Sequence, residues 1–206
     1  MEAATQAQVK LISPDFTTEV KSILVDAYSD ERTFMALFEH SKPNYLQRLR
    51  AFVREYCQAH LENDQSLLGL FVDEQLVGAA LYCGPGAHQG QEVTLKQRLA
   101  MMATLGIGNA NRYLSYQTQL KQAMPAGDWC YLPLVGVRHE FRGKGLGRLL
   151  LRRAWELSRD MPQSGGIALG SGAGSASDYY IQQGFSVVGH LDVAGTQEKL
   201  FFKASK

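Results

Sequence analysis

Apolar residues in this sequence recur with two spacings, which predict alternating helices and strands. Apolar positions three and four residues apart indicate amphipathic helices, whereas short apolar and β-branched runs between Gly, Pro and Asp indicate strands. The predicted helices cover residues 15–27, 46–57, 95–105, 111–122, 144–159 and 175–183. The predicted strands cover residues 9–12, 67–72, 76–82, 129–138, 166–170, 187–192 and 199–203.

This order of elements predicts an α/β fold, in which helices flank a mixed, mostly antiparallel sheet of about six to seven strands. Residues 89–124 interrupt the order, because they are helical in composition and polar at their edges. We interpret them as a helical insertion before the strand at 129–138. The 206 residues (1–206) fit a single domain, since single domains commonly run up to about 250 residues.

Composition narrows the class of protein. Hydrophobic residues make up 45% and charged residues 20% of the chain, which is ordinary for a soluble globular protein. The net charge of +1 gives no global field that would favour nucleic acid or an anionic membrane. Cys57, Cys83 and Cys130 lack metal-ligand spacing, so we expect reduced thiols, no metal site and a cytoplasmic location. The chain also shows no signal-peptide pattern and no apolar run long enough for a membrane span.

The segment 135–148 carries the most chemical information. An apolar strand end is followed by a basic, glycine-rich turn that opens directly into an amphipathic helix. A helix start exposes unpaired backbone N–H groups and the positive end of the helix dipole. Glycines let a phosphate approach these groups closely, because no Cβ stands in the way. The segment therefore predicts a pyrophosphate site, although an ordinary strand–turn–helix junction is the alternative.

Spacing excludes two nucleotide motifs. A dinucleotide fingerprint that starts at Gly143 and Gly145 needs a third glycine where Arg148 stands. A P-loop needs Ser or Thr after its Gly-Lys pair, but Lys144 is followed by Gly145.

The remaining pattern, Arg-x-x-Gly-x-Gly at Arg142, Gly145 and Gly147, resembles the acyl-CoA pyrophosphate loop of the GNAT superfamily of N-acetyltransferases. A second pattern, Tyr-x-x-x-Gly-Phe from Tyr180 to Phe185, resembles the closing motif of the same superfamily. The strand at 129–137 and the preceding insertion resemble the branch that contains puromycin N-acetyltransferase. Two features depart from that branch: His139 replaces its usual Pro, and residues 172–176 lack an Asn that many relatives carry.

The resemblance implies that an acetyl group passes from acetyl-CoA to a primary amine by direct attack in a ternary complex. It implies a sheet that splays at its central strands, where backbone groups of Val135 and Val137 bind the pantetheine arm and the Val137 amide faces the thioester oxygen. It also implies that Tyr180 is the general acid, with packing of its ring on the sheet as the alternative. The residues assigned to acetyl-CoA on this basis are Val135, Gly136, Val137, Arg142, Gly143, Lys144, Gly145, Leu146, Gly147, Arg148, Ser175 and Tyr180.

The acceptor side is less defined. No general base is assigned from the sequence, because an ordered water is an equal alternative to the four candidate side chains, Tyr131, Glu74, Glu140 and His139. We expect the acceptor pocket between the first two helices, the insertion and the last hairpin, with Tyr28, Phe34, Phe38 and Tyr113 as candidate aromatics. Because the sequence shows no acidic cluster, it favours a small or moderately apolar amine.

Three other functions stay open at this point. The first is acetylation of a protein or peptide amine, the second a catalytically silent CoA-binding module, and the third a docking domain that uses the insertion. Many relatives in this superfamily are dimers, so a homodimer is possible.

Overall fold

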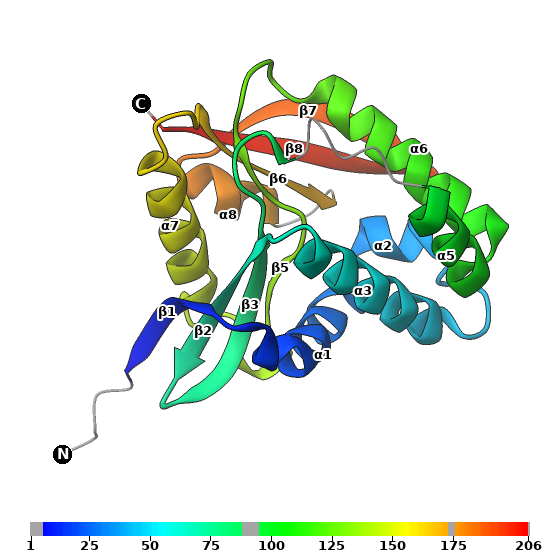
Figure 1. Ribbon diagram of the computed structural model, residues 1–206, viewed down its shortest axis with the longest axis horizontal. Helices are drawn as coiled ribbons and strands as arrows, with labels where there is room; N and C mark the ends of the chain where they lie inside the picture. Colours follow the sequence, from blue (N-terminus) through cyan, green and yellow to red (C-terminus); the bar gives the residue numbers. More distant parts are fainter. Residues whose placement is uncertain (1–5, 88–94, 173–175, 206) are drawn as a thin grey trace.

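The chain folds into two four-stranded sheets that separate near the middle of the molecule (Figure 1). The computed structural model describes residues 6–87, 95–172 and 176–205, without the side chains of residues 95–97 and 176. The first sheet has the order β1-β2-β3-β5 and is antiparallel throughout. Its strands are β1 (Ala7–Ile12), β2 (Ser66–Val72), β3 (Gln75–Tyr82) and β5 (Val135–Val137).

The second sheet has the order β4-β6-β8-β7. Its β4–β6 pair is parallel, and its other two pairs are antiparallel. Its strands are β4 (Cys130–Leu132), β6 (Gly166–Gly172), β7 (Ser186–Val193) and β8 (Thr196–Ala204). The predicted mixed, mostly antiparallel α/β architecture and the closing hairpin are therefore confirmed.

The predicted strand at 129–138 is divided into β4 and β5. Pro133 lies between them and has no N–H to donate, so the ladder breaks there. On one side β4 pairs with β6, and on the other β5 pairs with β3. This division brings the strands in the described residues to eight rather than six or seven. It also produces the separation of the sheets.

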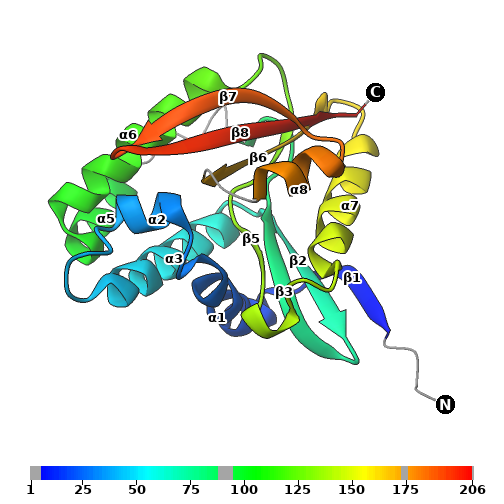
Figure 2. The same ribbon diagram turned by 180° about the vertical axis from the view of Figure 1, so that it is seen from behind.

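Helices cover both faces of the first sheet (Figures 1 and 2). On one face α7 packs against β1, β2 and β3, and on the other α1 packs against β3 and β5 and is backed by α3. The burial pattern follows this arrangement, because alternate residues of β2 belong to two different hydrophobic clusters. The bounds of these helices are α1 (Thr17–Tyr28), α3 (Tyr45–Glu62) and α7 (Leu146–Arg159).

The insertion forms two helices, α5 (Leu95–Leu105) and α6 (Ile107–Ala123), as the sequence predicts. Its expected first residues, 89–94, lie outside the described part of the chain. Helix α6 packs against β7 and buries Tyr113, Tyr116 and Leu120. No helix in the described ranges has the length and apolarity needed to cross a bilayer.

The short helix α2 (Arg32–Leu37) was not predicted. Its six residues are too few to show a helical period, and it is fixed by a cap instead: the Phe34 amide donates to Glu31 Oε2 at 3.0 Å. The last helix, α8 (Ala176–Gln182), ends before Gly184, which has φ +84°. This left-handed residue confirms the predicted glycine stop. Two 3₁₀ turns, η1 (Pro14–Phe16) and η2 (His139–Phe141), complete the described elements.

Candidate active site

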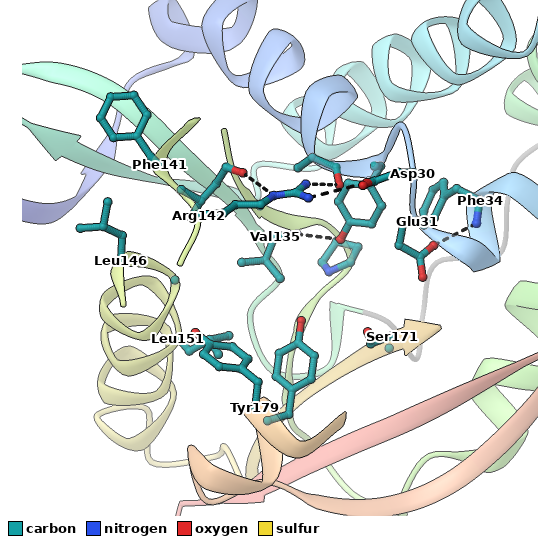
Figure 3. Close-up of a pocket in the computed structure, with 18 of the residues that line it drawn as sticks. Asp30, Glu31, Phe34, Val135, Phe141, Arg142, Leu146, Leu151, Ser171 and Tyr179 are labelled. Carbon is teal, nitrogen blue, oxygen red and sulfur yellow. Dashed lines mark hydrogen bonds and ion pairs between the residues drawn. The ribbon is translucent and has the colours of Figure 1, made fainter. Parts of the chain in front are cut away.

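A cavity of about 760 Å³ lies where the two sheets separate (Figure 3). Its walls come from α1, α2, α6, α7, α8, β5, β6 and β8. Most of the predicted acetyl-CoA residues line it, namely Val135, Gly136, Val137, Arg142, Gly143, Gly145, Leu146, Gly147 and Tyr180. Lys144 and Arg148 lie beside these residues in the same loop, are exposed, and do not line the cavity. Ser175 lies outside the described residues.

The free edge of β5 forms one wall of the cavity. The amide of Arg138 donates to Val77 O of β3 at 2.9 Å. Bonded and non-bonded positions alternate in an antiparallel ladder, so the backbone groups of Val135 and Val137 point away from β3. The sheet order places no described strand on that side. The Val135 amide there donates to the hydroxyl of Tyr28 at 3.0 Å, which leaves the Val137 amide directed into the gap.

Gly136, between these two valines, faces α1. A Cβ at this position would overlap the Cβ of Ala27. The glycine therefore lets α1 approach β5 closely, and this contact brings the Tyr28 hydroxyl to the strand edge.

The loop before α7 presents consecutive free amides. The amides of residues 143–147 donate no hydrogen bond to any group in the described part of the chain. Gly143 and Gly145 have φ +75° and +72°, a conformation that favours glycine. Gly145 caps α7 without a side-chain acceptor, and the first turn of α7 carries no acidic residue. This is the arrangement that binds an anion through backbone N–H groups and the helix dipole.

Arg142 is held by the protein itself (Figure 3). Its guanidinium donates to the carbonyl oxygens of Val137 (3.3 Å) and Ala27 (2.8 Å) and lies 3.7 Å from Asp30 Oδ1. These contacts tie the loop to the end of α1. Arg142 therefore contributes positive charge to the cavity wall, while the amides provide the geometry.

Tyr179 and Tyr180 of α8 both line the cavity, and each is partly buried. Burial raises the pKa of the Tyr180 phenol above its usual value, so the group is protonated at neutral pH. Its ring also packs on Phe201 at 5.0 Å between centroids. Tyr180 thus packs on the sheet and also lines the cavity, so the packing role does not exclude the role of proton donor.

Two carboxylates that the sequence analysis did not single out line the opposite wall. Glu198 of β8 is 2% exposed, and Glu31 stands at the start of α2. Glu31 accepts hydrogen bonds from the amides of Phe34 (3.0 Å) and Gly172 (2.9 Å). One signal for Glu198 was present: it lies two residues before Leu200, on the inward-facing side of an alternating strand.

The four candidate bases from the sequence lie outside the cavity. Glu74 and Glu140 are exposed and Tyr131 is buried, and none of the three lines the cavity. His139 lies 3.1 Å from Asp26 and 3.3 Å from Asp30, so it joins η2 to α1. Of the candidate aromatics, Tyr28 and Phe34 line the cavity, whereas Phe38 and Tyr113 belong to the core.

Comparison with known proteins decides the family. Residues 24–185 match the Acetyltransferase (GNAT) family. The chain belongs to the GNAT acetyltransferases. It is therefore an acyltransferase, and membership implies acetyl-CoA as the acyl donor. No curated protein sequence matches it significantly.

Solved structures show the same GNAT fold. One is described as histone acetyltransferase HPA2 and related acetyltransferase from Corynebacterium glutamicum (TM-score 0.71, 19% identity, 96% of each chain covered). Another is arylalkylamine N-acetyltransferase 2 from Aedes aegypti (TM-score 0.71, 13% identity, 98% of this chain and 100% of that one). A third is a polyamine N-acetyltransferase from Drosophila melanogaster (TM-score 0.64, 12% identity, 97% and 100%). At these identities the likeness concerns the fold alone.

Proposed function

We propose that this GNAT protein transfers the acetyl group of acetyl-CoA to the primary amine of a small molecule, by direct attack within a ternary complex. One observation carries the proposal. A single cavity joins the free amides before α7, the free edge of β5 and the Tyr180 phenol to a wall that bears two carboxylates. Donor and acceptor can therefore meet without a covalent enzyme intermediate.

The donor half of the cavity fits a coenzyme diphosphate. The amides of residues 143–147 supply the hydrogen-bond donors, and Arg142 and the start of α7 supply positive potential. Lys144 and Arg148 are exposed beside the loop and do not line the cavity. From the loop, the edge of β5 leads the pantetheine arm toward Val137.

The reacting centre lies between Val137 and Tyr180. The Val137 amide stabilises the negative oxygen that develops when an amine attacks the thioester carbonyl. Tyr180 donates its phenolic proton to the departing thiolate. Both roles follow the resemblance to the family, and the position of the two groups in one cavity supports them.

A small acceptor suits the rest of the cavity. The inserted helix α6 contributes Tyr116 to the wall and α2 contributes Phe34, so both elements close the acceptor side. Two of the similar structures are, by their names, acetyltransferases of arylalkylamines and polyamines. The resemblance to the puromycin acetyltransferase branch stays a prediction, since the family match does not distinguish branches.

Release of CoA thiol tests the proposal. Purified protein is incubated with acetyl-CoA and a panel of primary monoamines, polyamines, amino acids and peptides, and mass spectrometry identifies the acetylated product. We expect turnover with at least one small amine. Turnover only with peptides would favour the protein-directed alternative. Binding of acetyl-CoA without turnover on any amine would favour the silent module.

A further inference from the structure

We propose that Glu198 is the catalytic residue of the acceptor half, where its carboxylate binds the ammonium group of the amine and takes its proton. The inference rests on the proposed function and adds the general base, which the family resemblance left unassigned.

Only one oxygen of Glu198 has a partner among the described residues. The hydroxyl of Tyr116 donates to Oε1 at 3.0 Å, whereas Oε2 is buried without a hydrogen bond. The Thr33 hydroxyl, which is also buried, lies near enough to this carboxyl group to lower its pKa, although neither it nor Oε2 has a hydrogen-bond partner of ordinary geometry among the described residues. A buried, unsatisfied carboxylate oxygen is costly to a fold, and it lines the very cavity that must receive a cationic amine. An ammonium group supplies the missing donor and the compensating charge.

Two glycines of β6 leave room for the carboxylates of Glu31 and Glu198 in the cavity wall. Gly170 and Gly172 lie on one face of β6, since they are two residues apart along the strand. A Cβ at Gly170 would overlap Glu198 Oε1, and a Cβ at Gly172 would overlap Glu31 Oε1. The bare backbone of β6 thus lets both carboxylates lie over the same strand.

The surroundings of Glu198 offer negative or neutral groups. Facing it are Glu31 from the start of α2, Tyr116 from α6, Tyr131 from β4 and Tyr28 from α1. On β7 the residue opposite is Leu191, and β6 presents glycine.

Burial, and then the charge of Glu31, raise the pKa of Glu198 to about 8, although the hydroxyl groups of Tyr116 and Thr33 lower it. A base with this pKa is matched to proton transfer near neutral pH.

The proton balance is complete with the two substrates already named. Glu198 takes one proton from R–NH₃⁺, and the neutral nitrogen then forms a bond to the thioester carbonyl carbon. As the C–S bond breaks, Tyr180 gives its proton to the sulfur and takes the second amine proton from the new amide nitrogen. Glu198 later releases its proton to solvent. The products are the acetamide, CoA thiol and one proton.

The lining also defines the class of amine. The two carboxylates lie together, and the remaining acceptor wall is mostly apolar, with Phe34, Pro133 and Val135. This arrangement fits a primary amine with one positive charge and a compact apolar body. Asp30, the third acidic residue that lines the cavity, is paired with Arg142 and His139, so among the described residues it is not a free partner for the far ammonium of a long polyamine.

The pH dependence of kcat/KM tests the role of Glu198, with 2-phenylethylamine as the probe and acetyl-CoA saturating. For the wild-type protein we expect a bell-shaped curve of kcat/KM against pH. It rises with a pKa near 8 as Glu198 ionises, and it falls at higher pH as the ammonium group of the unbound substrate loses its proton. Glu198→Gln, which preserves shape and an acceptor for Tyr116, should lower kcat/KM about 10²-fold or more at pH 8. The kcat/KM of this variant should then depend on pH only through the ionisation of the unbound substrate amine, and the rising limb with a pKa near 8 should be absent.

Two further variants keep the test independent of how Glu198→Gln folds. Tyr116→Phe removes a hydrogen bond to the carboxylate, so the rising limb should move to higher pH. Gly170→Ala should displace the carboxylate and lower kcat/KM. Glu74→Gln, in an exposed turn, should change neither the rate nor the profile. Calorimetry should give the same acetyl-CoA affinity for all four variants.

The outcomes separate the two proposals. If the wild-type protein acetylates amines while Glu198→Gln keeps both the rate and the limb near 8, the role of Glu198 is overturned and the proposed function stands. If the wild-type protein acetylates no amine of the panel, the proposed function is overturned and the inference falls with it.

Discussion

The hydroxyl of Tyr179 lies directly over Gly147, in the first turn of α7. A Cβ on Gly147 would stand 2.9 Å from this oxygen and 3.8 Å from the ring carbon that bears it. The contact joins the two segments whose motifs indicated the family, the glycine loop and the last helix. The hydroxyl is buried without a partner among the described residues, and burial raises its pKa, so it remains a protonated donor beside the loop amides.

This contact predicts a rescue. Gly147→Ala should force α8 and the loop apart and weaken acetyl-CoA binding about tenfold, which corresponds to about 1.4 kcal/mol. Adding Tyr179→Phe removes the oxygen and leaves the nearest atom at ordinary van der Waals distance, so the double variant should recover most of the affinity. Calorimetric titration with acetyl-CoA measures both. A double variant no better than Gly147→Ala would contradict the account.

The left-handed backbone of Gly145 predicts a purely conformational cost. Gly145→Ala should lower the free energy of unfolding by about 1–2 kcal/mol, because φ is +72° although the space around it is open. Gly108→Ala is a matched control, since Gly108 is also in open space but lies within helix α6. Because Gly108 lies in the first turn of the helix, alanine there should stabilise by up to about 0.5 kcal/mol. Chemical denaturation of both variants checks the difference, and equal effects would argue against it.

The two neighbouring tyrosines should separate in function. Tyr180→Phe should lower kcat about 10²-fold or more, because the thiolate then leaves without a proton donor, while acetyl-CoA affinity stays nearly unchanged. Tyr179→Phe should keep most of kcat. Because burial raises the pKa of Tyr180, its ionisation should add no falling limb to the rate below pH 10. Steady-state kinetics on both variants decides the matter, and undiminished turnover in Tyr180→Phe would remove its role.

Ionised Glu198 should lower the free energy of unfolding at the pH values at which it acts as a base. The pKa of Glu198 is raised from 4.5 to about 8 in the folded protein. The contribution of its neutral form to the free energy of unfolding is therefore fully present below pH 4.5 and is lost as the pH rises to 8. At about 1.4 kcal/mol for each pH unit of displacement, the penalty above pH 8 is on the order of 5 kcal/mol.

Glu198→Gln should therefore resemble the wild-type protein in stability near pH 4.5 and exceed it increasingly up to pH 8. Denaturant unfolding at pH 4.5, 6, 7 and 8.5 measures this, with Glu74→Gln as the control that should show no trend. A constant difference across this range would mean that Glu198 is ionised at a normal pKa.

Local sequence patterns predicted the structure of the glycine-rich loop and of the helix that follows it. The glycines at 143, 145 and 147 indicated a turn whose backbone another group can approach closely, and the spacing of the apolar residues predicted helix α7. Both signals lie within one continuous segment, so no distant contact was needed to interpret them. The same holds for Gly184, whose left-handed φ ends α8.

The acceptor side could not be predicted in this way, because its parts are distant in the sequence. Gly170, Gly172, Glu31 and Glu198 come from β6, the start of α2 and β8, and only the fold brings them together. A glutamate in a closing hairpin is usually solvated, and the alternation that turns Glu198 inward is visible only once the buried face of β8 is known. The apolar run at 129–138 predicted one strand, and neither the break at Pro133 nor the change of sheet there was predicted.

A crystal structure with bound acetyl-CoA tests the central claim most directly. The account predicts that the diphosphate lies on the amides of residues 143–147, with the thioester oxygen within hydrogen-bond distance of the Val137 amide and the sulfur beside the Tyr180 hydroxyl. A diphosphate bound anywhere else, or a thioester that turns away from the edge of β5, would contradict it.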